Sequence, residues 1–452
     1  MTEVTKPGTT RELADFIVRT GFAVLPEVVR REGARAFLNW VGCVLGGCNH
    51  DAVAIAVAAA EEFSGPQRAS VLGRGRILDG INAAFVNCLA SSAHAFDDTH
   101  LATVTHPTGP VAAVLLALAE RGRITGAAYL AALALGIEVT CRLSNALLVP
   151  PARGQVGWYI TGVTGGIGAA LAAAKVWGLD RQQTIWALGL AAAQASGFRQ
   201  THATMATSFV PAHAARCGLQ AALLAARGFT CSDRILEGPH GLATVFAEEA
   251  HLAAATDGLG TRWEMLDNTY KPYPCGIVIH PAIDACLQLV QETALVPDTI
   301  ARVRLGVHPL CLTLCDRPAP GNAHEAKVSL QHWTAVSLVR RAAGLAEGTD
   351  ACVRDPAVCA VRDRVEAAPD ASVGRDGAVV RIELADGRLL EKWVEHCIGS
   401  LARPMTDAEL EAKFMGQALP VLSDAAARAL MHLCWRLEAL DDVAEVARAS
   451  FV

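Results

Sequence analysis

Aromatic residues are scarce in this chain. Phe, Trp and Tyr make up 5% of its 452 residues, which is little for a large sheet of β-branched and aromatic strands. Alanine is abundant and favours closely packed helices. The sequence therefore predicts a mostly α fold, and its length predicts two domains with a large core.

An excess of positive charge is also missing. The formal net charge is -6 at pH 7, and no Lys/Arg-rich run provides the basic field that nucleic acid or an anionic membrane attracts. Residues 1–6 lack the start of a signal peptide, and apolar runs such as Val111–Ala119 are far shorter than the roughly 18–20 residues that span a bilayer. We expect a soluble, cytoplasmic protein with neither nucleic acid nor membrane as a partner.

The fourteen cysteines do not follow a metal-binding pattern. No Cys-x-x-Cys pair occurs, and the nearest spacing is Cys311-x3-Cys315 without matching histidine pairs. Most cysteines in such a chain are small buried hydrophobic residues. We predict no metal site.

Helical periodicity dominates residues 1–268. Thr9–Glu12 has the pattern of a capping box at the start of a helix. Ala/Leu-rich helical segments follow, at Gly109–Arg121, Gly126–Leu143, Gly165–Trp177, Thr184–Ala195 and Ala212–Ala226. The glycine-rich run 162–168 matches neither a dinucleotide fingerprint nor a phosphate loop, and we expect it to let helices pack closely.

The pattern changes after Pro274. Residues 300–307 and 379–384 alternate apolar and polar side chains with a period of two, which is typical of half-buried strands. Helical runs lie between them, near Pro281–Thr293 and Leu330–Ala343. A small α+β domain is therefore predicted for residues 269–401. An acid-started helix at Thr406–Glu409 and a last helix over Asp424–Ala449 complete the chain.

Reactive side chains concentrate in one segment, Phe96-Asp97-Asp98-Thr99-His100, with His106-Pro107-Thr108-Gly109 close behind. Two adjacent carboxylates, a hydroxyl and two imidazoles are costly to bury, and they interrupt sequence that otherwise resembles core. Either the segment is a polar loop with Asp98 and Thr99 as helix caps, or it carries the chemistry.

Further motifs occur in a familiar order: Gly178–Asp180, Leu236–Gly238 with Gly241, Lys271–Cys275, His280–Asp284, and His324–Lys327 with Ser329. Together with the Asp-Asp-Thr and His-Pro segments, they resemble the MmgE/PrpD family over nearly the whole chain. Its members include 2-methylcitrate dehydratase, cis-aconitate decarboxylase and iminodisuccinate epimerase. The resemblance implies that residues 402–452 return to the helical domain, which is then discontinuous, that substrate lies between the two domains, and that the protein is a homodimer.

The resemblance also implies roles for the first motif. Asp98 and Thr99 would shape the site, with His100 beside them at the substrate. His106 would bind a substrate carboxylate or move a proton. Asp97 would orient His106 or remain a helix cap.

Lys271 is the second candidate. Pro272 and Pro274 stiffen the backbone around it at the predicted domain junction, which would fix its ammonium against a cleft. It would act as a base only if desolvated or placed beside another cation. Otherwise it would stabilise a carboxylate or enediolate. His280 begins a helix with Pro281 in the first turn, so it caps that helix or binds substrate.

Three positions depart from the common family pattern. Ala95 stands where members often carry Asp, Tyr159 where an imidazole is common, and Thr207 where a lysine is common. The last two changes remove positive charge, which favours a less charged substrate than a tricarboxylate. A phenol beside a cation ionises more easily than a free one, so Tyr159 could be an acid or a base. Charge would be restored by Arg199, His202 or His213 if these residues face the cleft.

Three functions follow as hypotheses. The first is a lyase that needs no cofactor, removes a proton α to a carboxylate or carbonyl of a small organic acid, and expels water or carbon dioxide. His106 and Tyr159 would do the acid–base work, Lys271 would stabilise charge, and Asp98 with Thr99 would position the substrate. The second is a two-base epimerase or racemase of a small carboxylate. The third is a divergent homologue that binds a small acid without turning it over.

Overall fold

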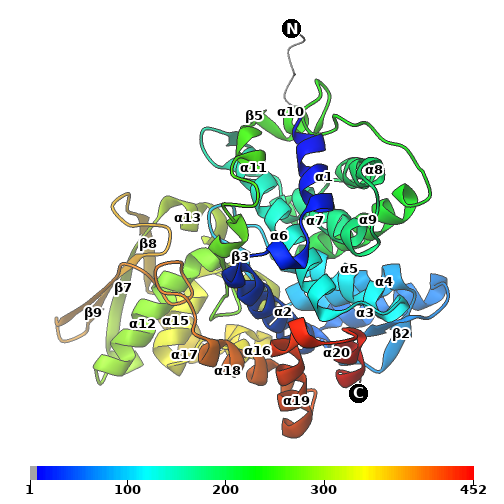
Figure 1. Ribbon diagram of the computed structural model, residues 1–452. Helices are drawn as coiled ribbons and strands as arrows, with labels where there is room; N and C mark the ends of the chain where they lie inside the picture. Colours follow the sequence, from blue (N-terminus) through cyan, green and yellow to red (C-terminus); the bar gives the residue numbers. More distant parts are fainter. Residues whose placement is uncertain (1–7, 452) are drawn as a thin grey trace.

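The computed structural model (Figure 1) describes residues 8–451 and contains two separate hydrophobic cores. The larger core joins helices from both ends of the chain, for example Leu13 with Leu430, and the smaller core lies within residues 275–397. The protein is thus mostly α, with a discontinuous helical domain and a smaller α+β domain. This confirms the fold class predicted from the sequence.

Long apolar helices form the first part of the helical domain. They are α1 (Thr9–Arg19), α2 (Glu27–Gly47), α3 (Asp51–Phe63), α4 (Gly80–Ser92), α5 (Thr108–Arg121), α6 (Gly126–Leu148), α7 (Ile160–Val176), α8 (Arg181–Ala192) and α9 (Ala206–Ala225), with the short α10 (Leu242–Phe246) and α11 (Ala253–Thr256). Two-stranded ladders join β1 (Ala69–Val71) to β2 (Arg76–Leu78), β3 (Thr99–His100) to β6 (Asn268–Thr269) and β4 (Arg153–Gly154) to β5 (Ala247–Glu249). The predicted helical segments are confirmed, although their ends differ by several residues.

Glycines let α7 pack tightly between α6 and α9. A Cβ atom on Gly168 would lie 2.5 Å from the Gly136 carbonyl oxygen of α6, and one on Gly218 of α9 would lie 2.6 Å from the Gly166 carbonyl oxygen. The backbones therefore approach where no larger side chain fits. The role expected for the glycine-rich run is confirmed.

One described helix, α6, is long and apolar enough by itself to cross a membrane, so the expectation that every apolar run is too short is wrong for this helix. In its most apolar stretch, 89% of the residues are buried inside the protein, as in a core helix. Helices α2 and α3 satisfy the same criterion only as a pair, and they bend by 86° at their junction.

The end of the chain returns to the helical domain through α18 (Asp407–Ala418), α19 (Asp424–Trp435) and α20 (Ala444–Ala449). Thr406 and Glu409 form a capping box at the start of α18, which packs against α2. The single helix expected over Asp424–Ala449 is wrong. It breaks after Trp435, and Asp442 accepts a hydrogen bond from the Ala444 backbone N–H at the start of α20.

The capping box expected at Thr9–Glu12 is also wrong. Helix α1 begins after Gly8, which has no capping side chain. The hydroxyl of Thr10 instead donates to Glu237 and accepts from the Leu236 backbone N–H. A tertiary contact thus takes the place of the expected local one.

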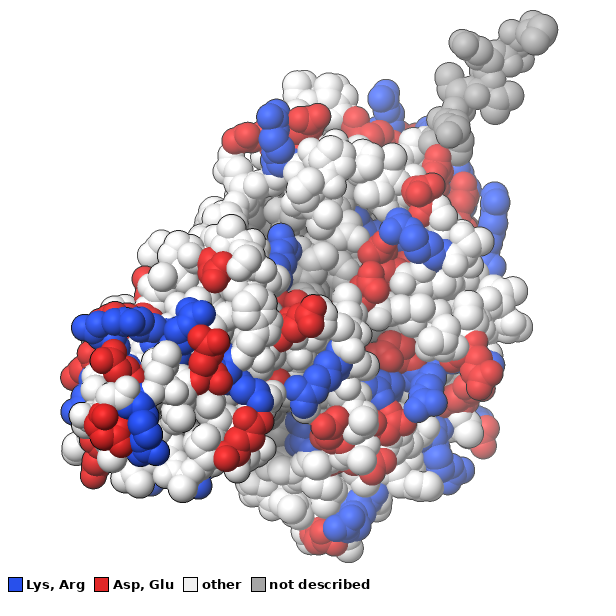
Figure 2. Space-filling view, turned by 90° about the vertical axis from the view of Figure 1, so that its left-hand side faces the viewer, with Lys and Arg blue, Asp and Glu red and all other residues white. Residues whose placement is uncertain are grey.

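A four-stranded sheet is the centre of the α+β domain. Its order is β10 (Leu389–Val394), β9 (Ala378–Leu384), β7 (Ile300–Val307) and β8 (Val365–Pro369), with only β7 and β8 parallel. The helices of this domain are α12 (His280–Glu292), α13 (Pro309–Cys315), α14 (Ala323–Ala326), α15 (Leu330–Arg340), α16 (Asp350–Val353) and α17 (Pro356–Arg362). Both predicted strands are confirmed. Basic and acidic side chains alternate at this end of the molecule (Figure 2), consistent with ion pairs such as Arg381–Glu391 between neighbouring strands.

Candidate active site

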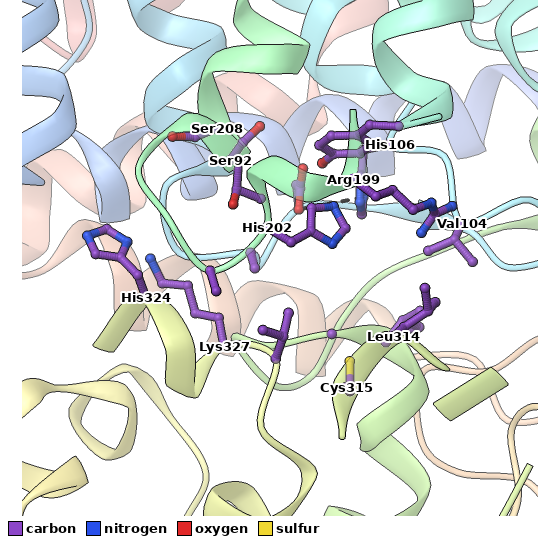
Figure 3. Close-up of a pocket in the computed structure, with 18 of the residues that line it drawn as sticks. Ser92, Val104, His106, Arg199, His202, Ser208, Leu314, Cys315, His324 and Lys327 are labelled. Carbon is purple, nitrogen blue, oxygen red and sulfur yellow. Dashed lines mark ion pairs between the residues drawn. The ribbon is translucent and has the colours of Figure 1, made fainter. Parts of the chain in front are cut away.

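A cavity lies between the two domains (Figure 3). Its walls in the helical domain come from the segment after α4, the start of α7 and the loop before α9. The α+β domain contributes residues around Lys271, Ile277, Cys315 and Lys327. The motifs that the sequence separates therefore meet at one site.

The ladder between β3 and β6 supports the cavity from behind. Thr99 pairs with Thr269, and the Thr269 hydroxyl donates to the Thr99 carbonyl oxygen at 2.7 Å. Lys271 follows this ladder directly along the chain. The Asp-Asp-Thr segment and the lysine are thus held in one register.

Asp98 does not line the cavity, so the catalytic role expected for it is not supported by its position. Its Oδ2 accepts from the Thr108 hydroxyl and the Asn268 amide, both at 2.6 Å, and from the Thr108 backbone N–H. Burial raises the pKa of this carboxyl to about 6, and the charge of Asp97 adds to the rise. Asp98 therefore links the start of α5 to β6. This structural role resembles the helix-capping alternative considered for it.

His106 is held as a neutral base. Its Nδ1 lies 2.7 Å from the Asp98 backbone carbonyl oxygen and 3.2 Å from the Thr99 hydroxyl. A carbonyl only accepts, so Nδ1 carries the proton and Nε2 keeps its lone pair. Burial lowers the pKa of His106 to about 4, against a raising effect of Asp97. The imidazole is therefore neutral at pH 7 and lines the cavity.

Lys271 forms a buried ion pair with Asp97. Its Nζ donates to Asp97 Oδ1 and to the Ala95 carbonyl oxygen, both at 3.0 Å. Burial would raise the pKa of Asp97, but the charges of a protonated His106 and of Lys271 hold it below its ordinary value. Ala95 adopts the left-handed conformation (φ 51°), which turns its carbonyl to the ammonium. Lys271, Asp97 and Ala95 all line the cavity.

Tyr159 is a neutral phenol in the cavity wall. It lines the cavity at the start of α7, edge-on to His106 with ring centroids 6.0 Å apart. Burial raises its pKa far above the ordinary value, and the opposing charge of Arg199 does not reverse the shift. The nearby cation eases ionisation, as expected, but loss of water around the phenol outweighs it, so the net shift of the pKa is upward.

Two cations reach into the cavity without a carboxylate partner among the described residues. Arg199 is on the helical side, where its Nε donates to the Trp158 carbonyl oxygen, and Lys327 is on the opposite wall, where its Nζ donates to the Ala93 carbonyl oxygen (Figure 3). Burial lowers the pKa of Lys327 to about 8. Both groups are available to hold anionic parts of a ligand.

Four other predicted site residues lie off the cavity. Thr99 is buried in β3 and contacts His106 from behind, whereas His100 bonds to Thr103 through Nδ1. His213 stacks on Phe209 and accepts from Arg216, on a face of α9 directed away from the cavity wall.

His280 is the last of these four. It is fully buried in the core of the α+β domain at the start of α12, with no side-chain cap bond. Its packing among apolar residues, edge-on to Tyr273, explains why it does not face the substrate.

The two halves of the chain match the models of one family. Residues 11–255 match the MmgE/PrpD N-terminal domain, and residues 273–437 match the MmgE/PrpD C-terminal domain. The chain belongs to the MmgE/PrpD family.

Similar proteins include named enzymes of this family. The human cis-aconitate decarboxylase (Homo sapiens) is 28% identical over 437 residues, covering 92% of this chain and 89% of the relative. The Mus musculus enzyme of that name is 29% identical over 387 residues, covering 81% and 77%, and the Aspergillus terreus one is 25% identical over 473 residues, covering 97% and 95%. The family and these relatives support a lyase-type enzyme.

All three departures from the common MmgE/PrpD pattern line the cavity. They are Ala95, Tyr159 and Thr207. The Thr207 hydroxyl donates to the Thr201 carbonyl oxygen, so it closes the loop before α9 rather than supplying charge. The three positions at which the sequence is expected to depart from the family pattern therefore all lie at the cavity wall.

The sequence alone does not place the two cations that lack a carboxylate partner within residues 8–451, Arg199 and Lys327. It leaves open whether Arg199 and His202 face the cleft, and it contains Lys327 and His324 only as part of a family motif; all four line the cavity. The available signal was that this motif contains a lysine and a histidine in the domain opposite His106. Periodicity could not show that they face the same space.

Proposed function

We propose that this protein is a lyase that acts on a small dicarboxylate, forming a carbanion or enediolate next to a carboxylate and losing water or carbon dioxide. One observation carries the proposal. The cavity holds a neutral imidazole with a free Nε2, between unpaired cations from both domains.

The charges of the cavity favour a dianion. Arg199, Lys271 and Lys327 supply three positive charges and Asp97 one negative charge, which leaves an excess of two. The imidazoles of His106 and His202 add none at pH 7, because burial lowers both pKa values to about 4. Two carboxylates would balance this excess, whereas a tricarboxylate would leave one charge uncompensated.

Each chemical role has a candidate side chain. For loss of water, His106 Nε2 takes the α-proton and the Tyr159 phenol protonates the departing hydroxyl. For loss of carbon dioxide, the carbon–carbon bond to one carboxylate breaks and a cavity acid protonates the carbanion. In both cases Lys271 stabilises the charge that develops on the remaining carboxylate, and Arg199 and Lys327 orient the substrate.

An epimerase is the second candidate, and Lys327 favours it. With its pKa lowered to about 8, part of this lysine is a neutral amine near pH 7, and it lies on the wall opposite the helical domain that carries His106. Two bases on opposite sides of a carbon can invert it. No leaving group is then needed.

The test follows carbon-13 NMR spectra of labelled acids incubated with the purified protein. The panel contains saturated, unsaturated and hydroxylated dicarboxylates, with cis-aconitate and citrate as tricarboxylates. Loss of water gives an alkene, loss of carbon dioxide gives bicarbonate, and inversion gives a stereoisomer. We expect a dicarboxylate to be turned over more efficiently, by kcat/KM, than either tricarboxylate.

Variants assign the roles. His106→Asn should lower kcat by roughly 100-fold or more, within the range that general bases contribute. Lys327→Met should raise KM by roughly 10- to 100-fold, because a charge-assisted bond contributes about 1.5–3 kcal/mol. Arg388→Gln, at an exposed arginine in the turn between β9 and β10, is the control. Binding of the acids without any turnover would contradict the lyase and the epimerase and would favour a non-catalytic binding protein.

A further inference from the structure

A second cluster of polar side chains lies beside the ladder between β3 and β6, outside the cavity. It contains His100 of β3, with Glu264 and Asp267 from the turn just before β6. One ligand atom of each residue lies within 4.8 Å of the other two. None of these residues lines the cavity between the domains.

One nitrogen of the His100 imidazole, Nε2, faces this cluster without a hydrogen bond within the described part of the chain. The side chain of His100 is 1% exposed. Nδ1 lies 2.8 Å from the Thr103 hydroxyl, so the ring is oriented and Nε2 is its free nitrogen. Glu264 Oε2 is 3.8 Å from Nε2, which is too long for a hydrogen bond.

The two carboxylates of this cluster are held to different degrees. Glu264 uses Oε1 for an ion pair with Arg262, while its Oε2 accepts from the Asn145 amide at 2.7 Å. Asp267 is exposed and makes no side-chain hydrogen bond to any of residues 8–451. Two carboxylates against one arginine leave a net negative charge beside the imidazole of His100.

We propose that His100, Glu264 and Asp267 bind a divalent transition-metal cation. Ligands of one such ion, with bonds of about 2.1 Å, lie about 3 Å apart. A rotation of the exposed Asp267 side chain and a small shift of Glu264 bring the three atoms to that spacing. One imidazole and two carboxylates suit ions such as Mn²⁺, and the hydrogen bond from the other ring nitrogen is typical of metal-bound histidine.

The cation would fasten the two segments that carry the candidate catalytic groups. His100 follows Asp97–Thr99 directly, and Glu264 and Asp267 lead through β6 to Lys271. Its role is therefore structural, and no step of the proposed reaction passes through it. The site is independent of the proposed function, because metal binding is measured without a substrate.

The experiment titrates Mn²⁺ into chelator-treated full-length protein and follows free Mn²⁺ by electron paramagnetic resonance. Mn²⁺ is the probe because the fourteen thiols would compete for zinc. We expect one equivalent to bind, a loss of affinity of at least 10-fold in Asp267→Asn, and no change in Asp298→Asn, a matched exposed aspartate in the α+β domain. Both substitutions are at exposed positions, so folding is preserved.

A spin-echo spectrum of the bound ion completes the test. Modulation from an imidazole nitrogen is expected in the wild-type protein and in Asp298→Asn, and should be absent in His100→Gln. Equal affinity in wild type and Asp267→Asn, no stoichiometric binding, or bound Mn²⁺ without nitrogen coupling would overturn the proposal.

Discussion

At the scale of single residues, a backbone carbonyl fixes the chemistry of His106. The Asp98 carbonyl oxygen fixes the proton on Nδ1, and burial keeps the ring neutral. The charge of Asp97 opposes this effect of burial and raises the pKa of His106. The pKa of Asp97 is itself held low by the charges of a protonated His106 and of Lys271. The carboxylate and the lysine together therefore set the pH range in which the imidazole is a base.

The acid limb of the pH profile tests this arrangement. A base must be unprotonated, so kcat/KM should fall as the pH decreases through about 4 rather than 6.5. Asp97→Asn removes the charge that raises the pKa of His106, so the limb should move to lower pH. Circular dichroism at each pH shows that the fold persists. A limb near 6.5, or one that Asp97→Asn moves upward, would contradict the assignment.

At the scale of elements, the α6–α7–α9 packing places Tyr159 and the loop before α9. Helix α7 starts directly after Tyr159, and α9 starts at the edge of the loop that carries Arg199 and His202. Their close approach depends on Gly136, Gly166 and Gly168. A change in this packing should reach the cavity wall.

Gly168→Ala tests that dependence. The added Cβ would lie 2.1 Å from the Thr140 hydroxyl and 2.5 Å from the Gly136 carbonyl oxygen, so the helices must move apart. We expect a loss of about 1–3 kcal/mol in the free energy of unfolding, measured with urea. Gly416→Ala in α18, where the new Cβ meets nothing within 4 Å, should instead stabilise the protein by about 0.5–1 kcal/mol. Equal effects of the two substitutions would contradict the account.

The same elements show what sequence alone can establish. The Ala/Leu-rich helical pattern predicts α7 and the period-two alternation predicts β7, because both signals are local. The Thr10 hydroxyl bonds to Glu237, and the segment after Trp435 is held by the Val443 backbone N–H, which donates to the Ile124 carbonyl oxygen at 3.0 Å. These partners are distant in sequence, so local patterns do not indicate them. The same contrast between local signals and distant contacts holds for the residues around the cavity. His106, Lys271 and Tyr159 stand in motifs or at a marked departure, whereas Asp98 has the right chemistry but faces α5 and β6.

At the scale of the whole molecule, the C-terminal return supports the site through Lys413 of α18. This buried lysine donates to Asn39 and to the Phe96 carbonyl oxygen, both at 2.7 Å, beside Asp97. Burial lowers its pKa to about 8. The end of the chain is thus connected to the reactive segment through one buried ammonium.

Lys413→Met should change the pH dependence of stability. Between about pH 8 and 10 the unfolded chain binds more protons at this lysine than the folded protein does, so wild-type stability rises with pH relative to the variant. The expected difference is roughly 2 kcal/mol across that window. Urea unfolding of both proteins at pH 8, 9 and 10 measures it, and parallel stability curves would contradict the buried charge.

Pairing of two copies is a further prediction at this scale. The family resemblance implies a homodimer, and an exposed groove between α3, α4 and α9 is lined by apolar side chains that include Ile55 and Phe209. We propose that two copies meet there. Light scattering should show a dimer at micromolar concentration and a monomer for Ile55→Asp. The control Val296→Asp, at an exposed apolar residue of the other domain, should remain dimeric. A wild-type monomer would contradict the prediction.

The most direct measurement of the central claim is the proton NMR spectrum of small dicarboxylates incubated with the wild-type protein in D2O. The account predicts that deuterium enters at the carbon next to a carboxylate, with or without net loss of water or carbon dioxide, and that His106→Asn abolishes this exchange. Exchange that persists in His106→Asn, or no exchange and no product with any dicarboxylate, would contradict it.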